Sequence, residues 1–174
     1  MSARFLEASR EFLLDECLPK IRLSTQALSD ADIWWRPVAG SNSIGNLILH
    51  LDGNARQWII SGIGGAGNVR NRDAEFAATG GTTGEALVAL LTATFLEIDR
   101  VLATIAPERL DEPRVIQGSH TTIFGAIFQV VEHVSMHTGQ IIQIAKWRAP
   151  GAVRFYEANN ASFTRLYAPT PRDG

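Results

Sequence analysis

Four stretches of the sequence place apolar residues at intervals of three and four, and this helical period limits the possible folds more than any other feature. Each stretch therefore has one apolar face that must be buried against another element. Ser43, just before the second stretch, belongs to a residue type that caps helix N-termini, and Pro19 is expected to kink or interrupt the first helix. The predicted helices span about residues 4–28, 43–61, 82–106 and 122–148.

The segment between the second and third predicted helices, residues 62–81, is rich in glycine and long for a connection within a bundle. Fully extended, about 18 such residues reach roughly 60 Å, whereas a helix of 20 residues is about 30 Å long. The segment can therefore cross the whole bundle and join parallel neighbours. Since no pair of strands is evident, we predict an all-α four-helix bundle with this long link between its second and third helices. The whole chain, 1–174, is expected to form one domain with a core over about 4–148 and a tail, 149–174, that packs on the bundle.

The composition fits one globular domain and excludes several classes of protein. A chain of 174 residues with 45% apolar residues can bury a core without disulfides or structural metals. The net charge of −2 provides no basic surface for nucleic acid, and no apolar run is long enough to cross a membrane. Cys17 is the only cysteine, so no internal disulfide can form, and the N-terminus lacks the pattern of a cleaved leader. We therefore expect a cytoplasmic protein that binds neither nucleic acid nor membranes.

Three of the four histidines lie at positions typical of a metal site. His133 and His137 are four residues apart, so both project from one face of the fourth predicted helix, at the border of its apolar stripe. His50 borders the apolar stripe of the second predicted helix in the same way. If the two borders face each other, three imidazoles converge and leave an open position, which is the ligand set of a catalytic zinc or a related divalent ion.

These histidines also have a simpler interpretation. A single buried histidine in a helix is more often a hydrogen-bonded core residue than a ligand, but a pair on one helix and a third on another favour a metal. His120 lies in a loop without such partners, so we predict that it is a surface residue. Asn54 and Gln140, each one turn from a candidate ligand, are weaker candidates for orienting a bound water, with ordinary helix polarity or solvent contact as the alternative.

Two segments around these histidines, NSIGNLILHLDGNARQWI and VVEHVSMHTGQIIQIAKW, resemble the DinB-like (YfiT-like) metalloenzyme superfamily. The stretch RNRDAEF before the third predicted helix is similar to the branch labelled DUF1572, and the resemblance extends over about residues 5–150. The resemblance implies that the metal ligands are His50, His133 and His137. It also implies an up-down-down-up bundle and a homodimer, which is common in the superfamily.

The resemblance further implies a chemistry, in which a low-molecular-weight thiol such as bacillithiol or mycothiol takes part in metal-dependent transfer or isomerisation of a small electrophile. A divalent ion suits this work, because coordination deprotonates a thiol whose free pKa is about 8.5. Zinc, nickel and iron all remain open as the ion, and a bound water would serve a hydrolase equally well. The alternative from another class is a non-catalytic metal-binding or stress-response module that binds a small molecule. No catalytic residue is predicted beyond the weak candidates Asn54 and Gln140.

Overall fold

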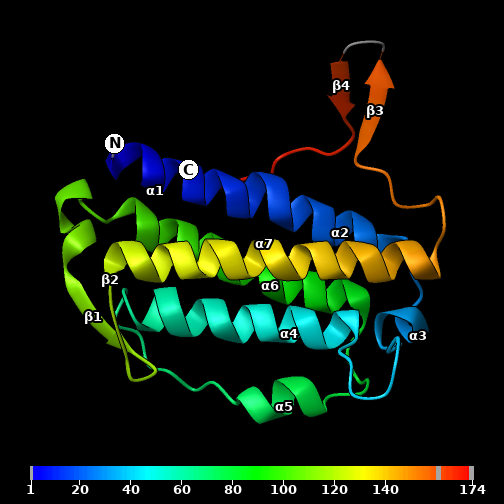
Figure 1. Cartoon of the computed structure of the whole chain (residues 1–174), viewed down its shortest axis with the longest axis horizontal. Helices are drawn as coiled ribbons and strands as arrows, with labels where there is room; N and C mark the ends of the chain where they lie inside the picture. Colours follow the sequence, from blue (N-terminus) through cyan, green and yellow to red (C-terminus); the bar gives the residue numbers. More distant parts are fainter. Residues whose placement is uncertain (1, 160–161, 173–174) are drawn as a thin grey trace.

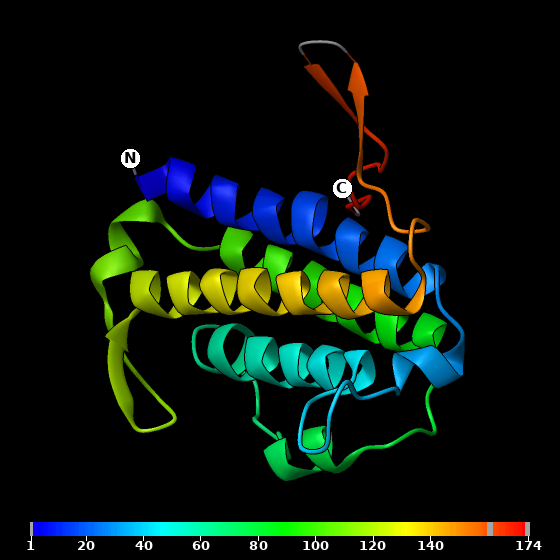
Figure 2. The same cartoon turned by 45° about the vertical axis from the view of Figure 1, so that its right-hand side comes forward.

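The computed structural model describes residues 2–159 and 162–172, and most of them are helical. The long helical segments are α1 (Ser2–Glu11) with η1 (Phe12–Cys17) and α2 (Leu18–Gln26), α4 (Ile44–Ala55) with η2 (Arg56–Ser61), α6 (Gly84–Ala103) and α7 (Ile123–Arg148). Figure 1 and Figure 2 show these segments side by side, with α7 in front between the N-terminal helices and α4, and with α6 behind. In Figure 1, α4 and α6 run in the same direction and α7 runs against them.

The apolar stripes of these segments meet in one core. α4 contacts α6 and α7, and α2 contacts the same two helices. Ile48, Leu91 and Ile141, from three different helices, are fully buried there. Side-chain caps begin α4, α6 and α7. The predicted cap Ser43 is confirmed, because its hydroxyl accepts a hydrogen bond from the N–H of Asn46.

The interruption that Pro19 predicts in the first helix is a π-helical turn, η1, just before the proline. Because proline has no N–H to donate, the helical hydrogen-bond ladder changes register there. The N–H of Leu18 bonds to the carbonyl of Leu13, five residues back in the chain.

The prediction of an all-α four-helix bundle is wrong, because the described residues also form two antiparallel β-hairpins. The paired strands are β1 (Pro113–Ile116) with β2 (Ser119–Thr122), and β3 (Tyr156–Asn159) with β4 (Ser162–Arg165). Short helices also interrupt stretches that the sequence indicated to be loops. They are α3 (Asp30–Ile33), α5 (Arg72–Ala77) and the 3₁₀-helix η3 (Pro107–Asp111). The fold is therefore mostly helical, with two small sheets added to the helices.

The first hairpin is hard to see in the sequence because each of its strands is only four residues long. Gln117 and Gly118 form its turn with φ angles of 54° and 74°, in the left-handed region that two-residue hairpin turns require. Because Gln117 stands where asparagine or aspartate is usual, the sequence lacks the Asn-Gly or Asp-Gly pair that indicates such a turn. The buried side chain of Ile116 lies against Gly62, just after η2, and so holds the hairpin near the end of α4.

The second hairpin projects from the helical body, as Figure 1 and Figure 2 show, and the chain after it returns to the first helix. The hydroxyl of Tyr167 donates to the carboxylate of Glu16 at 2.7 Å. Thr170 Oγ1 donates to the carbonyl of Leu14, within the π-helical turn, at 2.7 Å. Residues 173–174 of the expected tail lie outside the described residues.

Candidate metal centre

Three histidines meet where α4 and α7 cross in opposite directions. His50 projects from α4, and His133 and His137 project from successive turns of α7. The Nε2 atoms of His50 and His133 are 2.9 Å apart, and one ligand atom from each of the three rings lies within 4.8 Å of the others. The structure thus brings together the three residues that the sequence singled out.

The spacing of these rings fits one metal ion. Two nitrogens that each lie about 2.1 Å from an ion are about 3.0 Å apart at a right angle and about 3.4 Å apart in a tetrahedron. The 2.9 Å separation between His50 and His133 is close to this size, and a nitrogen of His137 lies within 4.8 Å of both rings. Two unprotonated nitrogens at that distance repel each other, so the contact needs a proton or a cation between them.

A buried carboxylate fixes the orientation of the His50 ring. Glu75, on α5, places Oε2 2.9 Å from His50 Nδ1. Arg70 holds the same carboxylate with two bonds, Nε donating to Oε1 at 2.7 Å and Nη2 donating to Oε2 at 2.8 Å. Arg70 Nη2 also lies 3.1 Å from His50 Nδ1, but the carboxylate is nearer and can only accept. It therefore favours the proton on Nδ1, with the lone pair of Nε2 facing His133. The exposed fractions of the His50, Glu75 and Arg70 side chains are only 7%, 9% and 5%.

Polar contacts hold α5 against α4. The Asn46 side chain, which caps α4 together with Ser43, donates Nδ2 to the carbonyls of Glu75 at 2.9 Å and Ala78 at 2.8 Å. Arg36 also donates to the carbonyl of Ala78, at 3.1 Å. Since the last carbonyls of a helix have no partner within it, these donors fix where α5 ends and hence where Glu75 lies.

A glycine on α4 leaves space for the ion pair between Arg70 and Glu75. A Cβ atom at Gly53 would collide with Glu75 Oε1 and lie 3.0 Å from Arg70 Nε. Gly53 is three residues after His50, on the adjacent turn of the helix. The missing side chain therefore lets the carboxylate approach the backbone of α4 beside the His50 ring.

The electrostatics of the centre favour the neutral form of His50 and His133. Burial lowers the pKa of His133 to about 4, and the neighbouring rings of His137 and His50 add to this. Burial also lowers the pKa of His50, although its bond to Glu75 acts in the opposite direction. Burial opposes ionisation of Glu75, but the hydrogen bonds from Arg70 and His50 outweigh it and lower the pKa of the carboxyl group. Neutral imidazoles are the form that binds metal ions.

The other predicted residues fall in different places. Gln140 lies beside the cluster, where its Oε1 accepts a hydrogen bond from His137 Nδ1 at 2.7 Å and leaves Nε2 of that ring unprotonated. Asn54 is 6% exposed, and its Oδ1 has no hydrogen-bond partner among the described residues. His120 is exposed, as predicted, but it lies on strand β2 and not in a loop.

The sequence did not reveal the roles of Arg70 and Glu75. Both lie in the stretch RNRDAEF, which served only as a mark of resemblance. No local spacing connects a glutamate in the long link to a histidine 25 residues earlier. The one clue is a glycine inside a helix beside a candidate ligand, since such a glycine often marks a close approach by another segment.

The arrangement defines a mostly helical protein with a cluster of two buried histidines and one half-buried histidine that could hold a metal ion. Residues 1–153 match the model of the family described as "Protein of unknown function (DUF1572)", and the chain belongs to that family. No curated protein matches the chain. Within the described part of the chain, none of the helices combines the length and the apolar composition that a membrane span requires.

We predict that Gly53→Ala destabilises the protein although alanine favours helices. The added methyl group displaces the Arg70–Glu75 pair, and overpacking of this kind costs about 1–3 kcal/mol. Gly139→Ala on α7 is the matched control, because a Cβ there meets nothing within 4 Å. It should stabilise the protein by up to about 1 kcal/mol. Denaturant unfolding measures both free energies, and equal stabilisation by the two substitutions would contradict the packing described here.

Proposed function

We propose that the protein is a divalent-metal-dependent enzyme of the DinB-like superfamily, in which His50, His133 and His137 hold one ion. The observation that carries this proposal is the cluster itself, with one nitrogen of each imidazole within 4.8 Å of the others. The His50 and His133 rings meet nitrogen to nitrogen at 2.9 Å, a separation that two ligands of one ion would also have. A set of three imidazoles suits zinc, nickel and iron, and it leaves a position free for a reacting molecule.

The surrounding residues support a catalytic centre. A bound divalent ion supplies Lewis acidity, which lowers the pKa of a thiol or water placed at its free position. Glu75 and Gln140 keep the protons of His50 and His137 on Nδ1, so that the other nitrogen of each ring can act as a ligand. Asn54, one turn from His50, offers a buried oxygen that can accept a hydrogen bond from the reacting molecule.

The proposed reaction is attack by a low-molecular-weight thiol on a small electrophile, giving transfer of the sulfur group or isomerisation. The resemblance of the histidine segments to DinB-like metalloenzymes supports this choice. Cys17 is not the source of the sulfur, because burial raises the pKa of this thiol to about 11 and makes it unreactive, so a thiol reaction here takes its sulfur from another molecule. Hydrolysis by a bound water is the second candidate, favoured by the unpartnered oxygen of Asn54.

Metal binding should depend on each of the three histidines. Protein reconstituted with zinc, nickel or iron is expected to hold about one ion per chain, and each single substitution to alanine should remove most of it. His120→Ala is the control, because His120 is exposed on β2. Circular dichroism should show that all four variants remain folded, since apolar burial supplies most of the stability of a domain this size. A triple-alanine variant that keeps its metal would overturn the proposed site.

Glu75→Gln should weaken metal binding by about 10–100-fold, because an amide orients and polarises the His50 ring less than a carboxylate does. Glu132→Gln is the matched control, since Glu132 adjoins His133 in sequence but is exposed. Competition with a chelator measures both affinities. Equal affinities would show that the carboxylate has no role in orienting the ligand.

Activity is tested with bacillithiol and monochlorobimane, which becomes fluorescent when a thiol displaces its chloride. The metal-loaded protein should accelerate this conjugation, and the triple-alanine variant and metal-free protein should not. Equal rates in the loaded protein and the triple-alanine variant would contradict the transferase. With metal binding intact, that result would favour a hydrolase or the non-catalytic module.

A further inference from the structure

A cavity of about 390 Å³ lies between the start of α4 and the end of α7. Leu47 and Ile144 line it and are 2% and 6% exposed, whereas Trp147 at its rim is 55% exposed. The remaining wall consists of Pro37, Ser41 and Asn42 from the loop before α4 and of Gln140 and Gln143 from α7. Cavities of about 300–1,000 Å³ with a mainly apolar lining are typical of small-molecule sites.

This cavity adjoins the histidine cluster. Gln140 lines the cavity and at the same time accepts the hydrogen bond from His137 Nδ1 at 2.7 Å. Leu47 lies three residues before His50 on α4, and Gln140 lies three residues after His137 on α7. Because α4 and α7 run in opposite directions, Leu47 and Gln140 each lie about one helical turn from the cluster, toward the same end of the helix pair.

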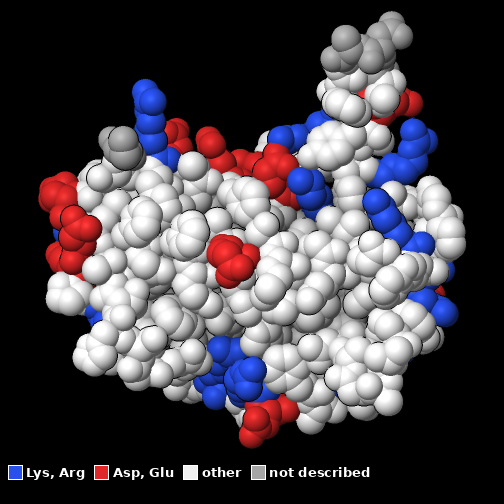
Figure 3. Space-filling view, viewed as in Figure 1, with Lys and Arg blue, Asp and Glu red and all other residues white. Residues whose placement is uncertain are grey.

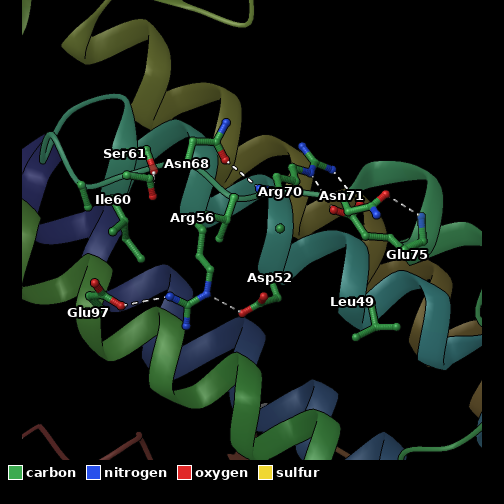
Figure 4. Close-up of a pocket in the computed structure, with 15 residues that line it drawn as sticks. Leu49, Asp52, Arg56, Ile60, Ser61, Asn68, Arg70, Asn71, Glu75 and Glu97 are labelled. Atoms are coloured by element: carbon green, nitrogen blue, oxygen red, sulfur yellow. Dashed lines mark hydrogen bonds and ion pairs between the residues drawn. The ribbon is translucent and has the colours of Figure 1, made fainter.

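The lining of the cavity carries no charge. Figure 3, seen as in Figure 1, shows an uncharged surface where the second half of α7 borders the start of α4. A second cavity, of about 460 Å³, lies on the other side of α4 and differs in this respect. Figure 4 shows Arg56 inside it between Asp52 and Glu97, with nitrogen–oxygen distances of 3.2 Å to each carboxylate. That second cavity also reaches the cluster through one residue, Glu75, but charged side chains line it.

We propose that the uncharged cavity beside Gln140 binds the electrophilic substrate, and that this substrate is a neutral small molecule with an apolar aromatic or aliphatic body. The inference rests on the proposed function and specifies its substrate class. Leu47, Ile144 and the indole of Trp147 contact the apolar body of the substrate. The amide of Gln140 offers the substrate a hydrogen bond on the side of the cavity that is next to the histidines. An ionised group in this cavity would lose its hydration without gaining a counter-ion, so charged molecules are excluded.

The test compares para-nitrotoluene with para-nitrobenzoate, which differ in a methyl group and a carboxylate. Metal-free protein is titrated with each compound, and the chemical shift of the Trp147 indole is followed by NMR. The neutral compound should bind at least about tenfold more tightly than the anion, since the site has no cation to replace water around the carboxylate. Comparable affinities, or shifts confined to residues away from Trp147, would overturn the proposal.

Two substitutions sharpen the test. Binding to these variants is followed at the side-chain amide of Gln140, which also lines the cavity. Trp147→Ala should weaken binding of para-nitrotoluene by about tenfold or more, while Phe128→Ala, at an aromatic residue 54% exposed elsewhere on α7, should leave it unchanged. Gln143→Arg adds a cation to the exposed rim and should raise the affinity for para-nitrobenzoate, a gain that unfolding cannot produce. Failure of either substitution to produce its expected effect would count against this site.

The same titrations separate this inference from the proposed function. If the metal-free protein binds para-nitrotoluene at Trp147 but binds no metal on reconstitution, the metal enzyme fails and the neutral-ligand site stands. If metal binds through the three histidines but neither compound shifts Trp147, the neutral-ligand site fails alone.

Discussion

The geometry of the histidine cluster depends on the buried ion pair between Arg70 and Glu75. This pair anchors the link between α4 and α6 to the middle of α4, and its carboxylate sets the tautomer of His50. Burying two charges costs of the order of several kcal/mol per ion, which their attraction only roughly offsets, so the pair adds little net stability. We infer that its role is to orient His50. Gly53 gives the pair space, and Asn46 fixes the end of the helix that carries Glu75.

The sequence was informative where structure is local. Apolar spacing placed the long helical segments within about three residues of their observed ends, since an amphipathic face and a side-chain cap are encoded in neighbouring residues. The same periodicity put His50, His133 and His137 on helix borders that could face one another, and the structure brings the three together. The ion that they would hold and the homodimer that the resemblance implies stay predictions.

The sequence did not predict the elements whose positions depend on contacts between residues far apart in the chain. The hairpin around Gln117 has strands too short for a clear alternation and a turn residue that is unusual at positive φ. The six-residue helix α5 ends where Arg36 and Asn46 donate to its carbonyls, and neither residue is near it in sequence. Glu75 reaches His50 only because of that helix, so no motif could assign it beforehand.

X-ray absorption at the metal edge of the reconstituted protein tests the central claim most directly. We predict three imidazole nitrogens about 2.0–2.1 Å from the ion, with an atom lighter than sulfur in the free position. We also predict that His133→Ala removes one imidazole from the spectrum or prevents loading. In protein loaded without any added thiol, a sulfur ligand at about 2.3 Å, or a shell of oxygens without imidazole, would contradict the proposed centre, because Cys17 is buried elsewhere in the core and the carboxylate of Glu75 is bound by Arg70.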